Sequence, residues 1–211
     1  MCKPSSVHPS VNAPLKRLID LTASWLGLIV LAPLFVCVSL AIYLKLGRPV
    51  LFRQTRAGYR ARPFTIYKFR TMANLRHADS ESLSDAEPIM GLGRFLRQTS
   101  IDELPQLWNV IRGDLSLVGP RPQILRHLTL DNAEQAHRHE VRPGMTGWAQ
   151  VNGRNAISWE EKFRRDSWYV DHWSHWLDMK IIMLTIITVI RCDGIEEKNL
   201  MAAVQEVNDQ H

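Results

Sequence analysis

The longest apolar segment of the chain lies near its N-terminus and predicts a membrane helix. Residues 21–43 carry no charged side chain. About 23 residues in helical conformation make roughly 35 Å of helix, which is long enough to cross the hydrocarbon core of a bilayer. We assign residues 15–46 to this helix. Residues 1–14 are rich in proline and serine and lack apolar periodicity, so they predict a flexible tail.

Two features of this segment predict that it enters and leaves the same side of the membrane. Pro33 lies near its middle, where it removes a backbone hydrogen bond and favours a kink. Lys16 and Arg17 precede the segment and Lys45 and Arg48 follow it, so the positive-inside rule places both ends in the cytoplasm. We expect a re-entrant helix. An ordinary span and a buried helix of a soluble domain are alternatives, whereas a signal peptide is disfavoured because no small-residue cleavage site follows.

A β-hairpin follows the apolar segment. Residues 50–55 and 64–72 have high β propensity and flank a turn at residues 56–59. In the second strand the two-residue period places Ile66, Lys68 and Arg70 on one face, with the two cations roughly 7 Å apart. That spacing suits a polyanionic ligand. The alternative is two solvated cations on an exposed strand.

The remaining pattern is mainly helical. Residues 74–87 are polar and predict a loop, and residues 123–140 predict one helix or a broken pair. Ser158 and Glu161 have the spacing of a capping box that opens a further helix. Residues 177–190 form an apolar helix too short to span a membrane. It follows an aromatic cluster of Trp168, Tyr169, Trp173 and Trp176, which is typical of a membrane interface but also of a packed core.

These elements predict an α+β, mainly helical, monotopic membrane protein with an N-terminal, Pro-kinked re-entrant helix, a small β-hairpin and interfacial amphipathic helices. A chain of 211 residues suits one domain with appendages. The net charge of +5 favours an anionic partner such as nucleotide phosphate, anionic lipid or nucleic acid. The three cysteines lack the spacing of a disulfide framework or a zinc site.

The most chemically suggestive segment contains two adjacent carboxylates, Asp102 and Glu103. Their simplest interpretation is structural, because Ser100 and Glu103 have the spacing of a capping box and acidic residues stabilise a first helical turn. The neighbourhood favours chemistry. Arg97 lies one turn upstream, and Arg121 stands between two prolines that restrict its backbone, which suits a fixed guanidinium that binds phosphate oxygens.

A glycine-rich stretch at residues 142–155 adds Arg142, Gln150 and Arg154 as candidate ligand-binding residues. It contains neither a dinucleotide-binding nor a P-loop motif, so an irregular structural loop is an equal alternative. Phosphoryl transfer needs cations that neutralise the transferring oxygens, a positioned nucleophile and usually a divalent metal. A carboxylate can itself attack phosphorus and form an acyl phosphate, which splits one transfer into two steps. Asp102 and Glu103 are therefore candidate catalytic residues and candidate Mg²⁺ ligands.

Five motifs, in this order, resemble the bacterial sugar transferase family, the small monotopic polyprenyl-phosphate phosphoglycosyl transferases. They are KRLID at 16–20, FTIYKFRTM at 64–72, SIDELPQLWNV at 100–110, GDLSLVGPRP at 113–122 and RPGMTGWAQVNGR at 142–154. The resemblance covers roughly residues 15–194, and five ordered motifs are far more specific than any one of them.

The resemblance implies a ping-pong enzyme at the cytoplasmic face of the bacterial inner membrane, with a cytoplasmic catalytic domain at 47–194 and a C-terminal tail at 195–211. Asp102 would attack the β-phosphorus of a UDP-sugar, UMP would leave, and the sugar phosphate would pass to polyprenyl phosphate, in family members undecaprenyl phosphate. Glu103 would assist with Mg²⁺ and protons. Lys68, Arg70, Arg97 and Arg121 match family positions near the phosphates.

The membrane helix differs from the family pattern at its bend. The family bends its helix at a Ser-Pro pair, and this chain has Ala32-Pro33, so no serine hydroxyl is available to satisfy the broken backbone. Residues 153–159 resemble members that use acetamido sugars, although hexose-specific members share the same core. The sequence does not decide between a monomer and a homodimer. The competing hypotheses are a non-catalytic, basic, membrane-anchored binding protein and a nucleic-acid binder, and no basic stripe supports the latter.

Overall fold

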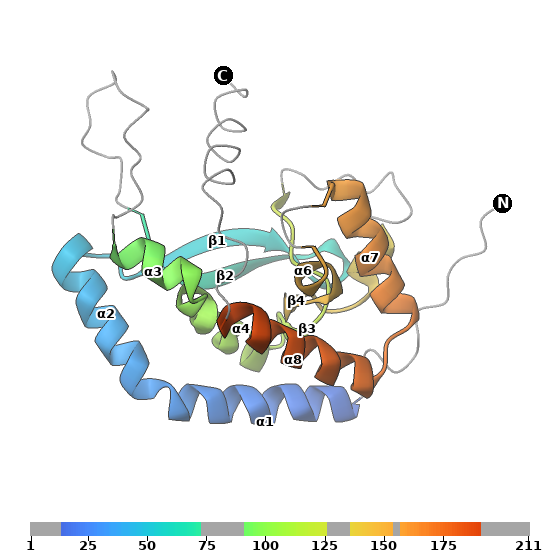
Figure 1. Ribbon diagram of the computed structural model, residues 1–211, viewed down its shortest axis with the longest axis horizontal. Coiled ribbons are helices and arrows are strands. Elements are labelled where there is room, and N and C mark those ends of the chain that lie inside the picture. The colour runs from blue at the N-terminus through green and yellow to red at the C-terminus, as the bar shows by residue number, and fades with distance from the viewer. Residues whose placement is uncertain (1–13, 73–90, 126–135, 154–156, 191–211) are drawn as a thin grey trace, which may run out of the picture.

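The computed structural model describes residues 14–72, 91–125, 136–153 and 157–190 of the chain. Its first part is a bent pair of helices, α1 at Pro14–Val30 and α2 at Ala32–Leu46 (Figure 1). The two helices meet at an angle of 61°. Within the described residues no single helix has the length and apolarity of a membrane span, whereas this bent pair satisfies that test when the two helices are taken together.

Pro33 explains the bend. It lies in the first turn of α2, where it has no amide hydrogen to donate to the carbonyl of Ile29 and its ring crowds that carbonyl. The hydrogen bond from the Phe35 amide to the Leu31 carbonyl, 2.9 Å long, restarts the helix on the far side of the break. The prediction of a kink at Pro33 is confirmed, and it forms without a serine at position 32.

The predicted hairpin is also present, with a shorter second strand and a longer turn. Strand β1, Leu51–Ala57, pairs antiparallel with β2, Pro63–Phe69, and Gln54 lies opposite Ile66. The turn includes the 3₁₀ segment η2, Tyr59–Ala61, whose last two residues adopt positive φ angles. Consequently Arg70 follows the strand instead of lying within it.

Short elements build the centre of the protein. Helix α3, Leu92–Gln98, leads into the 3₁₀ helix η4, Ile101–Gln106, and then α4, Leu107–Arg112. Strand β3, Ser116–Val118, pairs in parallel with β4, Gly144–Thr146. The first residue of β4 and the residue that follows β3 lie so close together that a Cβ on Gly144 would be 2.1 Å from the Gly119 amide nitrogen, so this approach requires glycine.

The last helices enclose this centre. They are α6 at Trp148–Val151, α7 at Trp159–Asp171 and α8 at His175–Ile190. As predicted, the Ser158 hydroxyl caps α7 by accepting a hydrogen bond from the Glu161 amide. The prediction of one helix or a broken pair over residues 123–140 is confirmed only at its described C-terminal end, where residues 136–137 are α-helical. Ile124 forms a β-bridge with Arg56, and residues 138–140 form one 3₁₀ turn, η6. Residues 126–135 and the predicted loop at 74–87 lie outside the described residues.

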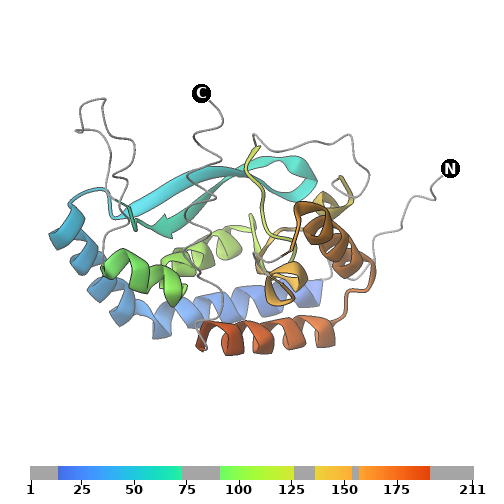
Figure 2. The same ribbon diagram turned by 45° about the horizontal axis from the view of Figure 1, so that its top comes forward.

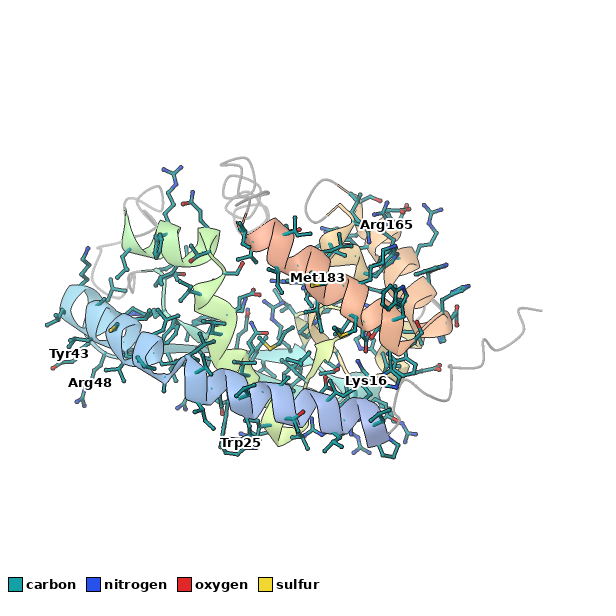
Figure 3. The ribbon with its side chains drawn as sticks, turned by 60° about the horizontal axis from the view of Figure 1, so that its bottom comes forward. Lys16, Trp25, Tyr43, Arg48, Arg165 and Met183 are labelled. Atoms are coloured by element: carbon teal, nitrogen blue, oxygen red, sulfur yellow. The ribbon has the colours of Figure 1, made fainter. Side chains whose placement is uncertain are left out.

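Helices α1, α2 and α8 share one face of the protein, with α8 beside α1 (Figure 2). A buried ion pair joins the starts of α1 and α8, with Lys16 Nζ 2.5 Å from an Asp178 carboxylate oxygen. Figure 3 shows this face and labels Trp25 and Tyr43, which are among its exposed residues. Large exposed apolar side chains continue along it: Leu18, Leu26, Ile29, Val30, Val36, Leu40, Leu44, Met179, Met183, Ile187 and Ile190. This extent of exposed apolar surface is typical of a membrane-binding or protein-binding face.

The aromatic cluster around the start of α8 divides between the two environments that the sequence allowed. Trp176 is 80% exposed, as an interfacial residue would be. Tyr169 and Trp173 are buried, and both belong to the main core cluster with Val118, Val170 and other residues. A second core cluster, which includes Val38, Ile42 and Phe69, packs α2 against the hairpin. The apolar face is therefore held to the rest of the protein by two separate cores.

Candidate active site

The two adjacent carboxylates lie in the first turn of η4. The turn begins at Ser100, which has a left-handed backbone with a φ of 55°. The Ser100 side chain forms no cap hydrogen bond, and its carbonyl oxygen accepts the Glu103 amide at 3.1 Å instead. The predicted capping box at Ser100 is therefore wrong. The left-handed residue ends α3 sharply and turns the chain, so Asp102 and Glu103 both line the adjoining cavity.

Glu103 is held by two cations from distant parts of the chain. Its Oε1 accepts a 2.6 Å hydrogen bond from Lys68 Nζ on β2 and a 3.1 Å hydrogen bond from Arg121 Nη2. Burial alone would raise the pKa of this carboxyl, but the charges and hydrogen bonds of Arg121 and Lys68 outweigh it and lower the pKa to about 2. Glu103 is therefore ionised at every physiological pH.

Asp102 has the opposite electrostatic character. Burial and the neighbouring charge of Glu103 raise its pKa to about 6, although Lys68, Arg97 and Arg121 act in the other direction. Within the described part of the chain, no donor forms a hydrogen bond to the Asp102 carboxylate. Its lone pairs therefore face the cavity with cations nearby, and this is the combination that a carboxylate nucleophile requires.

Two further predicted phosphate ligands line the same cavity but contact different groups. Arg97 Nε donates to Thr71 Oγ1 at 2.9 Å, which fixes the guanidinium near the carboxylates. Arg70 is buried and donates to the carbonyl of Leu46, with a longer contact of 3.4 Å to the carbonyl of Gly47. Arg70 therefore binds the carbonyl end of α2, and it joins the bent helix pair to the hairpin that carries Lys68.

The glycine-rich stretch contributes less than its composition suggested. Gln150 lines the cavity and donates to the Met145 carbonyl at 3.1 Å, and its Oε1 is buried without a donor among the described residues. Arg142 donates to the Gly113 carbonyl at 3.2 Å and is not among the residues that line the cavity. Arg154 lies outside the described residues.

A cavity of about 1300 Å³ connects these groups. Its polar part contains the two carboxylates and their cations. Its apolar part runs between α1 and α8 and is lined by Ala23, Leu117, Ile182, Ile186 and Val189. Ile186 is 48% exposed on α8, one of the helices that form the apolar face, and Ala23 of α1 is also exposed. The cavity therefore reaches the side of the protein on which α1 and α8 expose apolar residues.

A second polar group lines this cavity, and no sequence pattern indicated it. Arg56, Gln123, Arg138, Lys162 and Asp166 all line it. Arg138 and Asp166 form a buried ion pair with a 2.7 Å separation, although 28 positions separate them. No local spacing indicates such a pair. A weak local signal lies in the PRPQ sequence, because Gln123 directly follows the Pro-Arg-Pro segment that carries Arg121.

The described residues contain no cluster of three or more potential metal ligands among His, Cys, Asp and Glu. Asp102 and Glu103 are nevertheless suited to Mg²⁺, which is usually bound by one or two carboxylates together with substrate phosphates and water. Asp102 has free lone pairs for this purpose, whereas Oε1 of Glu103 already accepts from two cations. The donor set therefore fits a metal that binds together with a phosphorylated ligand, with Asp102 as the stronger candidate.

Comparison with known proteins identifies the family. The sequence model described as bacterial sugar transferase matches residues 11–192. An uncharacterized sugar transferase, EpsL of Bacillus subtilis, is 51% identical over 90% of this chain and 94% of its own length. A UDP-glucose:undecaprenyl-phosphate glucose-1-phosphate transferase of Caulobacter vibrioides is 41% identical over 91% of this chain and 76% of its own. An Escherichia coli protein of the same name is 38% identical over 83% of this chain and 40% of its own length. This chain belongs to the bacterial sugar transferase family.

Proposed function

We propose that this protein transfers a sugar 1-phosphate from a UDP-sugar to undecaprenyl phosphate and releases UMP, at the cytoplasmic face of the bacterial inner membrane. The names of the Caulobacter and Escherichia relatives supply this substrate class. The observation that carries the proposal is the position of Asp102, which lies among three cations in a cavity that also reaches the exposed apolar face. One site can thus bind a soluble anionic donor and a lipid-linked acceptor.

In the first step, a carboxylate oxygen of Asp102 attacks the β-phosphorus of the donor. The bond between this phosphorus and the bridging oxygen breaks, and UMP leaves with that oxygen. The product on the enzyme is an aspartyl sugar-phosphate. Lys68, Arg97 and Arg121 neutralise the oxygens around the transferring phosphorus, and their fixed positions reduce the reorganisation that the reaction requires.

In the second step, an oxygen of the acceptor phosphate attacks the same phosphorus and the bond to Asp102 breaks. The carboxylate is regenerated and the lipid carries a sugar diphosphate. The acceptor phosphate is anionic and needs no strong base. The low pKa of Glu103 argues that this residue holds Lys68 and Arg121 in place and supports the metal, with little capacity to carry protons at neutral pH.

Mg²⁺ would bind at Asp102, with support from Glu103, and would supply positive charge to the phosphate oxygens during transfer. The residues of the chain perform the remaining tasks. Arg121 and Lys68 are fixed by Glu103 at 3.1 and 2.6 Å, and Arg97 is fixed by Thr71. Each cation is therefore oriented before the donor binds.

The apolar part of the cavity supports a lipid-linked acceptor. It lies between α1 and α8, whose exposed side chains continue the same apolar surface outside the cavity. A re-entrant bent pair places this surface at the bilayer, and Lys45 and Arg48 at its end suit anionic headgroups. The isoprenoid chain can then remain in an apolar environment while its phosphate reaches Asp102.

The test is release of UMP by the purified protein from a panel of UDP-sugars, acetamido sugars included, in the presence of undecaprenyl phosphate and Mg²⁺. The wild-type protein releases UMP and transiently retains the label of a donor labelled in the β-phosphate. We expect Asp102→Asn to lose at least 10³-fold in rate and all retained label. The matched control is Asp171→Asn, which removes a carboxylate on the end of α7 that pairs with His137.

Two outcomes would overturn the proposal. If the wild-type protein releases UMP from no member of the panel, the reaction is wrong. If Asp102→Asn keeps its turnover and its covalent label, the nucleophile is wrong. A protein that binds membranes and nucleotides without turnover would support the competing hypothesis of a non-catalytic binding protein.

A further inference from the structure

One wall of the cavity contains a buried arginine with unused hydrogen-bond donors. Arg138, on η6, is 4% exposed and lines the cavity. Its Nη2 donates to the Arg121 carbonyl at 2.7 Å and pairs with the Asp166 carboxylate at the same distance. Its Nε and Nη1 are buried and have no acceptor among the described residues. Leaving such donors unpaired is costly, so the geometry points to a ligand that accepts from them.

A buried acceptor lies on the same wall. Gln123 is 6% exposed and lines the cavity, and its Oε1 has no donor among the described residues. The backbone around it is fixed, because the Gln123 carbonyl accepts the Ala57 amide at 2.8 Å. Gln123 stands two residues after Arg121, whose carbonyl Arg138 binds. The wall therefore presents donors and one acceptor in close succession.

Aromatic rings border this polar group. The Arg138 guanidinium carbon lies 5.1 Å from the centroid of the Phe163 ring, and the Trp159 ring lies 6.0 Å from the Phe163 ring. Both rings line the cavity, and Trp159 is exposed, with Lys162 Nζ 4.5 Å from its ring centroid, so a base would stack on its other face. A flat aromatic side chain beside hydrogen-bonding groups is the usual environment for a nucleobase that stacks and is recognised along its edge.

We infer that this wall, defined by Gln123, Arg138, Trp159 and Phe163, is a uracil-binding subsite. The inference rests on the proposed function, which supplies a UDP-sugar as donor. The edge of uracil presents a carbonyl, the N3–H and a second carbonyl. Arg138 N–H groups match a carbonyl oxygen, and Gln123 Oε1 matches the N3–H. The cytosine edge presents an acceptor at N3 and an amino group beside it, so it places an acceptor opposite Gln123 Oε1.

The charges favour a neutral ligand edge over a second anion. Asp166 already neutralises Arg138 at 2.7 Å, and an anion would also meet the lone pairs of Gln123 Oε1. The subsite is also well placed relative to the phosphates. Arg121 reaches Glu103 with its side chain while Arg138 holds its carbonyl. A diphosphate at Arg121 would therefore have its nucleoside within reach of Arg138.

Gln150 is the alternative residue for recognising the base, because it also lines the cavity, and its buried Oε1 has no donor among the described residues. Its aromatic neighbour Trp148 is occupied elsewhere. The Trp148 ring stacks on Trp168 with a 5.3 Å centroid separation, and Trp148 is not among the residues that line the cavity. Gln150 therefore offers an acceptor without an adjacent stacking surface in the cavity.

The test is the ratio of dissociation constants for CMP and UMP, measured by calorimetry on the purified full-length protein. We expect the wild-type protein to prefer UMP by roughly 10- to 100-fold, the discrimination that a bidentate base contact provides. Gln123→Leu removes the acceptor and leaves an apolar side chain of similar size, and we expect it to reduce the ratio to within about 3-fold. Gln123→Glu keeps an acceptor and retains the preference. Thermal unfolding of each variant confirms that it is folded.

The matched control is Gln150→Leu, which should leave the ratio unchanged. A ratio near unity in the wild-type protein, or a ratio that collapses in Gln150→Leu and persists in Gln123→Leu, overturns the subsite. The proposed reaction is tested independently through Asp102→Asn, which loses turnover and keeps the preference for UMP. If the protein shows no turnover but its preference for UMP depends on Gln123, the proposed reaction is wrong and the subsite is supported.

Discussion

Two aspartates in this protein each lie close to a lysine, yet their surroundings differ completely. Asp178, at the start of α8, is buried and accepts hydrogen bonds from Lys16 at 2.5 Å, Tyr169 at 2.7 Å and Trp173 at 3.0 Å. Asp102, in η4, accepts none within the described residues, although Lys68 acts on its charge. The first carboxylate joins the apolar face to the core. The second has its lone pairs available to a ligand.

The difference separates a structural charge from a reactive one. Asp178 exchanges its hydration for three donors, so its burial is compensated and the group is inert. Asp102 loses hydration without gaining donors, and Glu103 adds a like charge beside it, which together raise its pKa to about 6. Two of the three cations that act on Asp102, Lys68 and Arg121, form their ion pairs with Glu103 instead. Glu103 thus keeps the nucleophile unpaired while it holds the positive charge close by.

The largest expected effect contrasts the two aspartates directly. Asp178→Asn removes the carboxylate that pairs with the buried ammonium of Lys16, so we expect it to destabilise the protein by roughly 3–5 kcal/mol, equivalent to a fall in Tm of about 10 °C. In the folded protein, burial and the charge of Glu103 disfavour the ionised form of Asp102. Asp102→Asn removes this unfavourable charge, so we expect Tm to stay constant or rise. Thermal unfolding in the same detergent or nanodisc compares the two variants.

The pH dependence of this contrast has a definite sign. The pKa of Asp102 in the folded protein, about 6, lies above its usual value of 3.8. The folded state therefore binds more protons between about pH 4 and 6, and stability falls as pH rises through this window. The gain in Tm from Asp102→Asn should be largest above pH 6 and absent near pH 4. A gain that grows toward low pH would contradict the assignment of a raised pKa.

The next effect concerns how Glu103 changes the pKa of Asp102. Glu103→Gln removes the like charge beside Asp102 and releases Lys68 and Arg121 toward it, so the pKa of Asp102 should fall. The acid limb of kcat/KM, expected near pH 6 in the wild-type protein, should move to lower pH. We expect the maximal rate to fall by roughly 10²-fold, since removal of one electrostatic group in an active site costs this much.

The measurement is UMP release across pH 4.5–8.5 with saturating Mg²⁺. The matched variant is Glu160→Gln, an exposed residue of α7, which should leave both the limb and the maximum in place. An acid limb that stays near pH 6 in Glu103→Gln, or that moves upward, would show that Glu103 does not control the ionisation of Asp102.

Local patterns predicted the parts of the fold that depend on few neighbouring residues. The bend at Pro33 follows from one missing amide hydrogen, the hairpin from β propensity on either side of a turn, and the cap of α7 from the Ser158 and Glu161 spacing. The carboxylates at 102 and 103 were recognisable because they are adjacent in sequence. Their unequal pKa values were not, because these depend on Lys68 and Arg121 from elsewhere in the chain.

Long-range pairings explain what the sequence did not reveal. Arg70 carries the charge expected of a phosphate ligand, yet it binds the end of α2, and only the packing of the hairpin against that helix decides this. No pattern distinguished Arg138 from the other cations of residues 123–140, and only the fold shows that it is buried against Asp166. The parallel pairing of β3 with β4 joins segments whose strands have three residues each, too short for periodicity to identify.

The smallest expected effect contrasts two serines that share one sequence pattern. Ser158 and Ser100 are each followed by a glutamate three residues later, but only Ser158 accepts a hydrogen bond from that glutamate's amide, at 3.2 Å. Ser158→Ala should therefore cost about 1 kcal/mol, a fall in Tm of about 2–4 °C. Ser100→Ala removes no cap and keeps the same strained positive φ, so Tm should change by less than about 1 °C. Equal falls in Tm for the two variants would mean that Ser100 caps η4 in solution. Such a cap would reorient the first turn, which carries Asp102, and would alter the distances from Glu103 to its two cations.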